Sequence, residues 1–126
     1  MNKIKITERL YASAVAEDWE EFEKYLHPDF VIRESAALPY AGTYRGVQGF
    51  RDVVRTVFTR FQRLEAEPGN YMEGDDYVAA IVMLRGKGKL TGRNFETSVV
   101  ELFRFEDGKV IEILPYYWDQ QLINEN

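Results

Sequence analysis

Three long segments of alternating apolar and polar residues fill the C-terminal half of this chain and constrain its fold more than any other feature. They cover residues 77–89, 94–105 and 110–118, and the turn sequences Thr91-Gly92 and Glu106-Asp107-Gly108-Lys109 separate them. A period of two places successive side chains on opposite faces of a strand, and tight turns join antiparallel neighbours. The pattern predicts an antiparallel meander, and strands of this length must twist and coil strongly.

The N-terminal part has helical periodicity instead. Residues 6–16 repeat apolar side chains at spacings of three and four, with Thr7 as the expected N-cap. A second short helix is predicted over residues 19–26, capped by Asp18 and ended by the dipeptide His27-Pro28, because the residue before a proline disfavours helical geometry. Two helices are therefore expected before the first strand.

The middle of the chain contains segments with the strand period of two and a segment with helical periodicity. Residues 30–35 alternate as a short strand, and a loop rich in Ala, Pro and Gly follows as far as residue 46. An apolar stripe predicts the longest helix over residues 47–61, and a weak strand is expected over 63–73. We expect residues 1–126 to form one α+β domain, in which helices pack on one face of the coiled sheet and enclose a cavity.

Composition argues against several classes of protein. The chain has no cysteine, so it has no disulfide framework and no thiolate zinc cluster. The net charge is -5 and the basic residues are dispersed, unlike the basic patches of nucleic-acid binders. The N-terminus is polar, and no apolar run approaches the roughly 18 to 20 residues of a membrane span. We expect a soluble cytoplasmic protein that binds neither nucleic acid nor membranes.

Aromatic residues make up 14% of the chain, and such rings both fill cores and line ligand sites. We therefore expect the cavity to bind a small apolar molecule. The rings proposed to contact it are Tyr11, Trp19, Phe58, Tyr116 and Trp118. Core packing explains alternate members of the C-terminal aromatic cluster equally well.

Two glutamates are the candidates for catalysis. Glu101 lies in an apolar run of a central strand, where desolvation raises the pKa of a carboxyl group. It either stays neutral, as a hydrogen-bond donor or an acid, or forms a salt bridge to an arginine such as Arg85. Glu34 shares a strand face with Phe30 and Ile32, so it points inward if they do, and otherwise lies at a solvated strand end. Two inward carboxyl groups can divide the roles of acid and base at neutral pH.

Histidine contributes little to these hypotheses. His27 is the only one in the chain, which excludes a metal site built from several histidines. At the end of a predicted helix it is expected to interact with the helix dipole rather than to act in catalysis. Without a glycine-rich phosphate-binding motif, the sequence predicts neither a metal nor a cofactor.

Several short segments, taken in their order and spacing, resemble a known family. They are Glu17-Asp18-Trp19, Leu26-His27-Pro28-Asp29-Phe30, Tyr44-Arg45-Gly46, residues 103–110 and Tyr117-Trp118. Over almost its whole length the chain resembles the SnoaL-like and ketosteroid-isomerase-like group of the nuclear-transport-factor-2-like (NTF2-like) superfamily. The resemblance implies a cone-shaped, cystatin-like α+β barrel, with a strongly curved, mostly antiparallel sheet around three N-terminal helices. It also implies a homodimer formed through the sheet.

The resemblance also implies roles for the acidic residues. Glu34 falls at the position of the isomerases' general base, and Glu101 at that of their protonated, oxyanion-stabilising aspartate. The isomerases' oxyanion tyrosine on the first helix matches Leu10 by its spacing to Asp18, and Tyr11 is rotated from it by about 100°. This departure argues against steroid isomerisation and leaves the polyketide-cyclase branch open.

The expected function is isomerase, lyase or cyclase chemistry beside a carbonyl group of an apolar substrate. Non-catalytic ligand binding by the same cavity is one alternative. A dimeric interaction domain with a filled core is the other, and a cavity of several hundred cubic ångströms would count against it.

Overall fold

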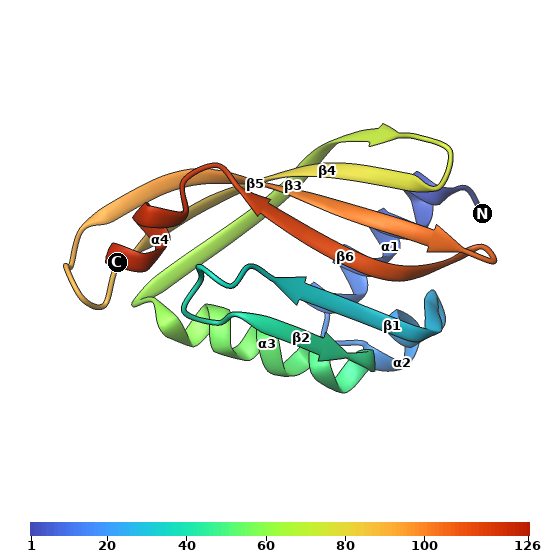
Figure 1. Cartoon of the computed structure of the whole chain (residues 1–126), viewed down its shortest axis with the longest axis horizontal. Coiled ribbons are helices and arrows are strands. Elements are labelled where there is room, and N and C mark those ends of the chain that lie inside the picture. The colour runs from blue at the N-terminus through green and yellow to red at the C-terminus, as the bar shows by residue number, and fades with distance from the viewer.

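A computed structural model describes residues 1–126 and contains one curved six-stranded sheet with four helices (Figure 1). The helices are α1 (Lys3–Val15), α2 (Trp19–Glu23), α3 (Gly46–Arg60) and α4 (Gln120–Glu125). The strands are β1 (Leu26–Glu34), β2 (Gly42–Arg45), β3 (Arg63–Glu73), β4 (Tyr77–Lys87), β5 (Asn94–Glu106) and β6 (Lys109–Tyr117).

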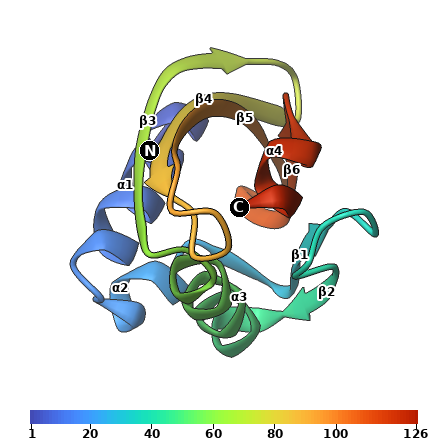
Figure 2. The same ribbon diagram turned by 90° about the vertical axis from the view of Figure 1, so that its left-hand side faces the viewer.

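The sheet has the strand order β2-β1-β6-β5-β4-β3. Every neighbouring pair is antiparallel except β1 and β6, which are parallel. Seen end-on, the strands curve in an arch, with α1 beside β3 and α3 below (Figure 2). Helix α3 packs on β1, β2 and β3, and α1 packs on β3 and β4. The predicted α+β architecture with a strongly curved, mostly antiparallel sheet is confirmed.

Side-chain caps fix where the first two helices begin. Lys5 N donates to Asn2 Oδ1, so α1 starts four residues before the expected N-cap. Thr7 is inside the helix, where its hydroxyl donates to the carbonyl of Lys3, and its assignment as N-cap is wrong. Asp18 caps α2 as predicted. Asn2, a polar residue earlier in the chain, therefore caps the first helix in place of Thr7.

The second helix is shorter than the sequence predicts. It ends at Glu23, and both His27 and Pro28 belong to β1. Parallel pairing with β6 draws these residues into the sheet. The register shifts between Leu26 and Val31, and a proline is tolerated at such an irregularity because no ladder hydrogen bond is required of it.

Two elements lie in segments that were expected to be irregular. The segment expected as a loop contains β2, a short edge strand in which Tyr44 pairs with Ile32. The expected polar tail contains α4, capped by Asp119 and anchored by Ile123, which is fully buried. Both elements depend on partners distant in sequence, so local patterns did not reveal them.

The buried apolar side chains form two groups. One lies among α1, α2 and the sheet and includes Phe22, Phe30 and Phe103. The other lies near α4 and includes Phe61 and Phe95. The two groups border the cavity described below. None of the helices is both long and apolar enough to cross a membrane.

Candidate ligand cavity

A cavity of about 650 Å³ opens inside the curved sheet. Of the 27 residues that line it, 20 are hydrophobic. They come from the concave face of the sheet and from α1, α2 and α3. The volume lies within the roughly 300 to 1,000 Å³ typical of small-molecule sites.

Strand register brings the two predicted carboxyl groups to one wall. Glu101 of β5 pairs with Pro115 of β6. On the other side of β6, Ile32 of β1 pairs with Ile113, and extending that register by two residues brings Glu34 to Pro115. The glutamates thus lie on the same concave face with β6 between their strands, so their backbones are two strand spacings, about 9.6 Å, apart. Both side chains line the cavity.

Glu101 is held by a tyrosine. Tyr11 Oη donates to Glu101 Oε1 at 2.5 Å, while Oε2 has no hydrogen-bond partner in the protein. Burial raises the pKa of the Glu101 carboxyl group, and the hydrogen bond from Tyr11 opposes that rise. Burial also raises the pKa of Tyr11, so this hydroxyl keeps its proton. The displacement of Tyr11 by one position therefore does not remove a tyrosine from the site.

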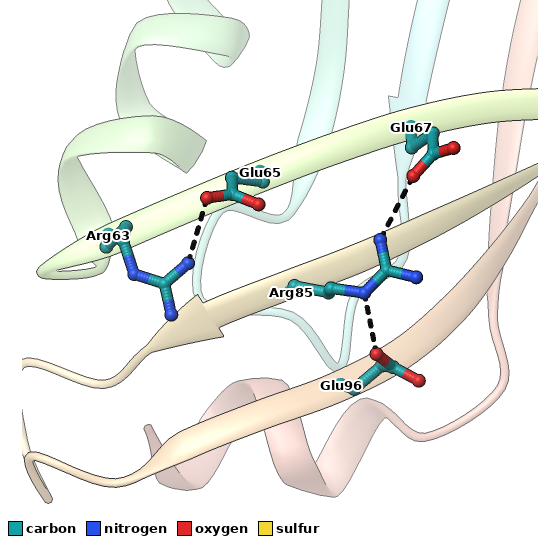
Figure 3. Close-up of polar contacts among 5 residues, drawn as sticks. All are labelled: Arg63, Glu65, Glu67, Arg85 and Glu96. Carbon is teal, nitrogen blue, oxygen red and sulfur yellow. Dashed lines mark hydrogen bonds and ion pairs between the residues drawn. The ribbon is translucent and has the colours of Figure 1, made fainter.

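The alternative of a salt bridge between Glu101 and Arg85 is wrong. Arg85 points from the opposite face of β4, where Nε is 2.7 Å from Glu96 Oε2 and Nη1 is 3.1 Å from Glu67 Oε2 (Figure 3). Residues 85 and 101 are both odd-numbered, but they are on different strands. The turn between β4 and β5 pairs Arg85 with Glu96 and Ala80 with Glu101, so the side chains of Arg85 and Glu101 lie on opposite faces. No cationic side chain pairs with Glu101.

Glu34 lies inside rather than at a solvated strand end. Its side chain belongs to a residue only 9% exposed, and Oε1 is buried without a hydrogen-bond partner. Burial, and secondarily the negative charge of Glu101, raise the pKa of Glu34 to about 8. Near neutral pH, Glu34 is therefore mostly protonated, and a minor fraction is present as the carboxylate.

Three of the predicted aromatic residues line the cavity. These are Tyr11, Trp19 and Phe58. The Tyr11 ring packs edge-on against Phe103, with the ring centroids 5.5 Å apart. The Trp19 ring lies under the guanidinium group of Arg51, 5.3 Å from the ring centroid. These contacts orient the rings around the apolar space.

The other two predicted rings point away from it. Tyr116 is 58% exposed and Trp118 is 85% exposed, and neither lines the cavity, so that placement is corrected. Pro115 points inward beside Glu101, which turns Tyr116 outward and Tyr117 inward. The prediction missed four lining rings, Phe22, Phe50, Phe103 and Tyr117, of which only Tyr117 belongs to this C-terminal cluster. Strand alternation was the available signal, but its phase required the register with β5.

His27 lies outside the cavity on β1. Its Nδ1 accepts a hydrogen bond from the backbone N–H of Asp29, so the proton of a neutral ring lies on Nε2. That nitrogen is 3.5 Å from a Glu106 carboxyl oxygen and 3.9 Å from one of Asp107. The predicted interaction with a helix end is wrong because His27 is in a strand.

The family model described as a SnoaL-like domain matches residues 7–113. Among curated proteins, none has a sequence that matches this chain. Solved structures share the fold over nearly the full length. An NTF2-like protein from Burkholderia thailandensis is 24% identical, with a TM-score of 0.82 and coverage of 96% of this chain and 93% of that one.

Two further solved structures share the fold, one described by an enzyme class and one solved with a small molecule. A protein from Jannaschia described as a SnoaL-like polyketide cyclase is 18% identical, with a TM-score of 0.76 and coverage of 97% and 89%. TerC, co-crystallised with polyporic acid, is 21% identical, with a TM-score of 0.79 and coverage of 97% and 95%. The family match confirms the predicted SnoaL-like family, and these structures confirm the predicted fold.

Proposed function

The chain belongs to the SnoaL-like domain family, and we propose that it is an enzyme that moves a proton beside a carbonyl group of a small apolar substrate. The supporting observation is the pair of glutamates, Glu34 and Glu101, on one wall of an apolar cavity without a cationic partner. Unpaired carboxyl groups are costly to bury, and strongly perturbed carboxyl groups in clefts are typical of functional sites. Isomerases, lyases and cyclases all use such a proton transfer.

Each side chain has a separate role in this proposal. The Glu34 carboxylate takes a proton from the carbon next to the carbonyl group. The electron pair of that C–H bond forms the C=C bond of an enolate, and the π pair of the C=O bond moves to the oxygen. Protonated Glu101 donates a hydrogen bond to the developing oxyanion through Oε2. Tyr11 is a positioning residue, because its hydroxyl is already bonded to Glu101 Oε1. The resulting enolate is then protonated at carbon, closes a ring or expels a leaving group.

Hydrogen–deuterium exchange of tetralone tests the first step without knowledge of the natural substrate. Tetralone is a bicyclic ketone, and NMR in D2O measures the loss of its α-proton signal. General base catalysis contributes roughly 10² to 10⁴ in rate, so Glu34→Gln should remove nearly all protein-dependent exchange. Glu101→Gln should reduce exchange by on the order of tenfold, because an amide still donates a hydrogen bond.

Glu96→Gln is the matched control, since Glu96 lies on the outer face of the same strand as Glu101. It should leave exchange unchanged. The rate should rise from pH 6 to 8 and level off above that, because the base must be ionised and the pKa of Glu34 is about 8. Equal exchange in wild type and Glu34→Gln, with tetralone bound to both, would overturn the proposal.

Ligand binding without turnover is the second candidate. It is favoured by the pKa of about 8 for Glu34, which keeps this carboxyl group protonated and able to donate a hydrogen bond at neutral pH. A pure binding protein would bind tetralone most tightly below pH 8 and show no protein-dependent exchange at any pH. The two functions are therefore separated by the same pH series.

We also propose the homodimer through the sheet that the family resemblance implies. The outer face of the sheet carries apolar side chains on adjacent strands, supporting an interface. These side chains are Ile81, Met83, Val100, Leu102, Leu114 and Tyr116. Light scattering of wild type and Leu102→Asp should give a dimer and a monomer, respectively, and a monomeric wild type would refute this proposal.

A further inference from the structure

A pair of tyrosines adds a second polar site to the cavity wall, besides the two glutamates. Tyr117 ends β6 and lines the cavity, whereas Tyr40 lies between β1 and β2 and is only 3% exposed. Tyr40 Oη donates to Tyr117 Oη at 2.6 Å. The segment that carries Tyr40 is fixed in turn, because the hydroxyl of Tyr44 donates to the Tyr40 carbonyl at 2.9 Å.

This bond leaves one hydroxyl proton unused. A tyrosine hydroxyl has one proton to donate, and the Tyr40 proton is engaged in the bond between the rings. The Tyr117 proton has no acceptor in the protein. Burial raises the pKa of Tyr117, and the negative charge of Glu34 raises it further, so the hydroxyl stays protonated. Tyr117 is thus a hydrogen-bond donor that needs an acceptor from within the cavity.

The Tyr117 hydroxyl is a separate polar group from the Glu101 carboxyl group. Tyr117 pairs with Val99, two residues along the sheet from the pair formed by Glu101 and Pro115. Two residues of strand span about 6.6 Å, so the side chains of Tyr117 and Glu101 extend from different points along the wall. Glu34 lies on the strand beside β6, near the skeleton of a molecule that reaches from one point to the other.

We infer that Tyr117, oriented by Tyr40, binds a second oxygen of the ligand, so that the substrate is a hydroxyketone or diketone with an apolar skeleton. This inference rests on the proposed function for the placement of the first carbonyl group, at Glu101. Tyr117 then determines specificity: it selects molecules with two oxygen functions at a fixed separation and holds the reacting carbon near Glu34.

Calorimetric binding of tetralone and its ring-hydroxylated isomers tests the inference. At least one hydroxylated isomer should bind wild type about tenfold more tightly than tetralone, the gain expected of one added hydrogen bond. Tyr117→Phe should abolish this gain, so that the hydroxylated isomer binds this variant no more tightly than tetralone does. Tyr116→Phe is the matched control, because Tyr116 is the outward-facing neighbour, and it should retain the full gain.

A measurement on wild type alone covers the case in which Tyr117→Phe folds poorly. With ¹³C-labelled tyrosine, the Cζ resonance of Tyr117 should shift further with the favoured hydroxylated isomer than with tetralone. The inference is overturned if no isomer gains affinity, if the gain survives Tyr117→Phe, or if the two ligands shift this resonance equally. The ratio of the affinities for the hydroxylated isomer and tetralone does not depend on turnover. The proposed function is refuted by a different result, namely an exchange rate that Glu34→Gln does not change.

Discussion

Two glutamates five residues apart on β5 have opposite environments. Glu96 points outward and is bound by Arg85, which also pairs with Glu67 (Figure 3). Glu101 points into the cavity, where its only protein partner is the hydroxyl of Tyr11. Because the residues differ by an odd number, strand alternation alone sends them to opposite faces. The difference separates an exposed, paired charge from a carboxyl group whose pKa is raised by burial.

The outer face repeats the arrangement seen at Glu96. Glu112 of β6 lies between Arg33 and Arg104, at 2.8 Å and 3.3 Å. Partial burial acts to raise the pKa of Glu112, but the bonds to the two arginines together outweigh it and lower the pKa. Inside the cavity, burial raises the pKa of both carboxyl groups. An acid with a lowered pKa is ionised at all ordinary pH values, whereas one with a raised pKa can exchange a proton near neutrality. Only the inner pair suits acid–base chemistry.

The largest effect on stability is expected from Glu34→Gln. The pKa of Glu34 is about 8 in the folded protein and 4.5 ordinarily, so between these values the folded state binds more protons than the unfolded state. Its contribution to stability is therefore greatest below pH 4.5 and falls with rising pH, by up to about 1.4 kcal/mol per unit. In urea unfolding, Glu34→Gln should match wild type near pH 4.5 and exceed it by a few kcal/mol at pH 8.

Glu96→Gln serves as the control for this pH series, since Glu96 is an exposed, paired acid. Its stability should follow the wild-type pH profile. Parallel profiles for wild type and Glu34→Gln would contradict the comparison between the two faces, because they would mean that Glu34 ionises equally readily in the folded and unfolded states.

A smaller effect is expected from Tyr11→Phe. This change removes the hydrogen bond to Glu101 but keeps the ring, and a lost bond of this kind costs about 1 to 3 kcal/mol when the partner is left unsatisfied. The pKa of Glu101 should rise further, since the bond lowers it. Urea unfolding and NMR titration of the Glu101 carboxyl carbon measure the two changes.

Tyr25→Phe provides the matched comparison. Tyr25 Oη also donates to a glutamate, Glu21, at 2.7 Å, but this bond lies outside the cavity. The variant should lose less stability than Tyr11→Phe, because water can replace the donor. Equal losses would show that the cavity does not strengthen the hydrogen bond to Glu101.

The smallest effect is expected from disrupting the outer ion pairs. Glu96→Gln removes one partner of Arg85, which retains Glu67. Exposed pairs contribute little and are screened by salt. The urea midpoint should therefore change only slightly at low salt and coincide with that of wild type in 1 M NaCl. A large loss that persists in salt would indicate that the outer pairs hold the sheet together.

The sequence predicted the long elements well because each carries a pattern of its own. Alternation over eleven or more residues identifies β4 and β5, and the apolar stripe identifies α3. Its predictions were poorest where pairing partners decide the structure. The strand β2 exists because β1 lies beside it, and the residues around Pro28 extend β1 because β6 lies beside them.

The candidate site shows the same division. Glu101 and Glu34 could be singled out because a carboxyl group between apolar neighbours is unusual in a strand, and burial follows from those neighbours. The choice between Tyr116 and Tyr117 depended on the phase of one short strand relative to another. The bond between Tyr11 and Glu101 joins residues 90 apart in the chain, and no local pattern contains it.

By itself, then, the sequence determined the α+β class, the curved sheet and the presence of two isolated acids, because these follow from periodicity and from the cost of burying charge. The tertiary structure decided which groups meet. Register set Glu34 and Glu101 on one wall, turned Tyr117 inward toward Tyr40, and left Arg85 outside with Glu96. Hydrogen bonds and pKa shifts act over a few ångströms, and such distances arise only when strands far apart in the chain are brought side by side.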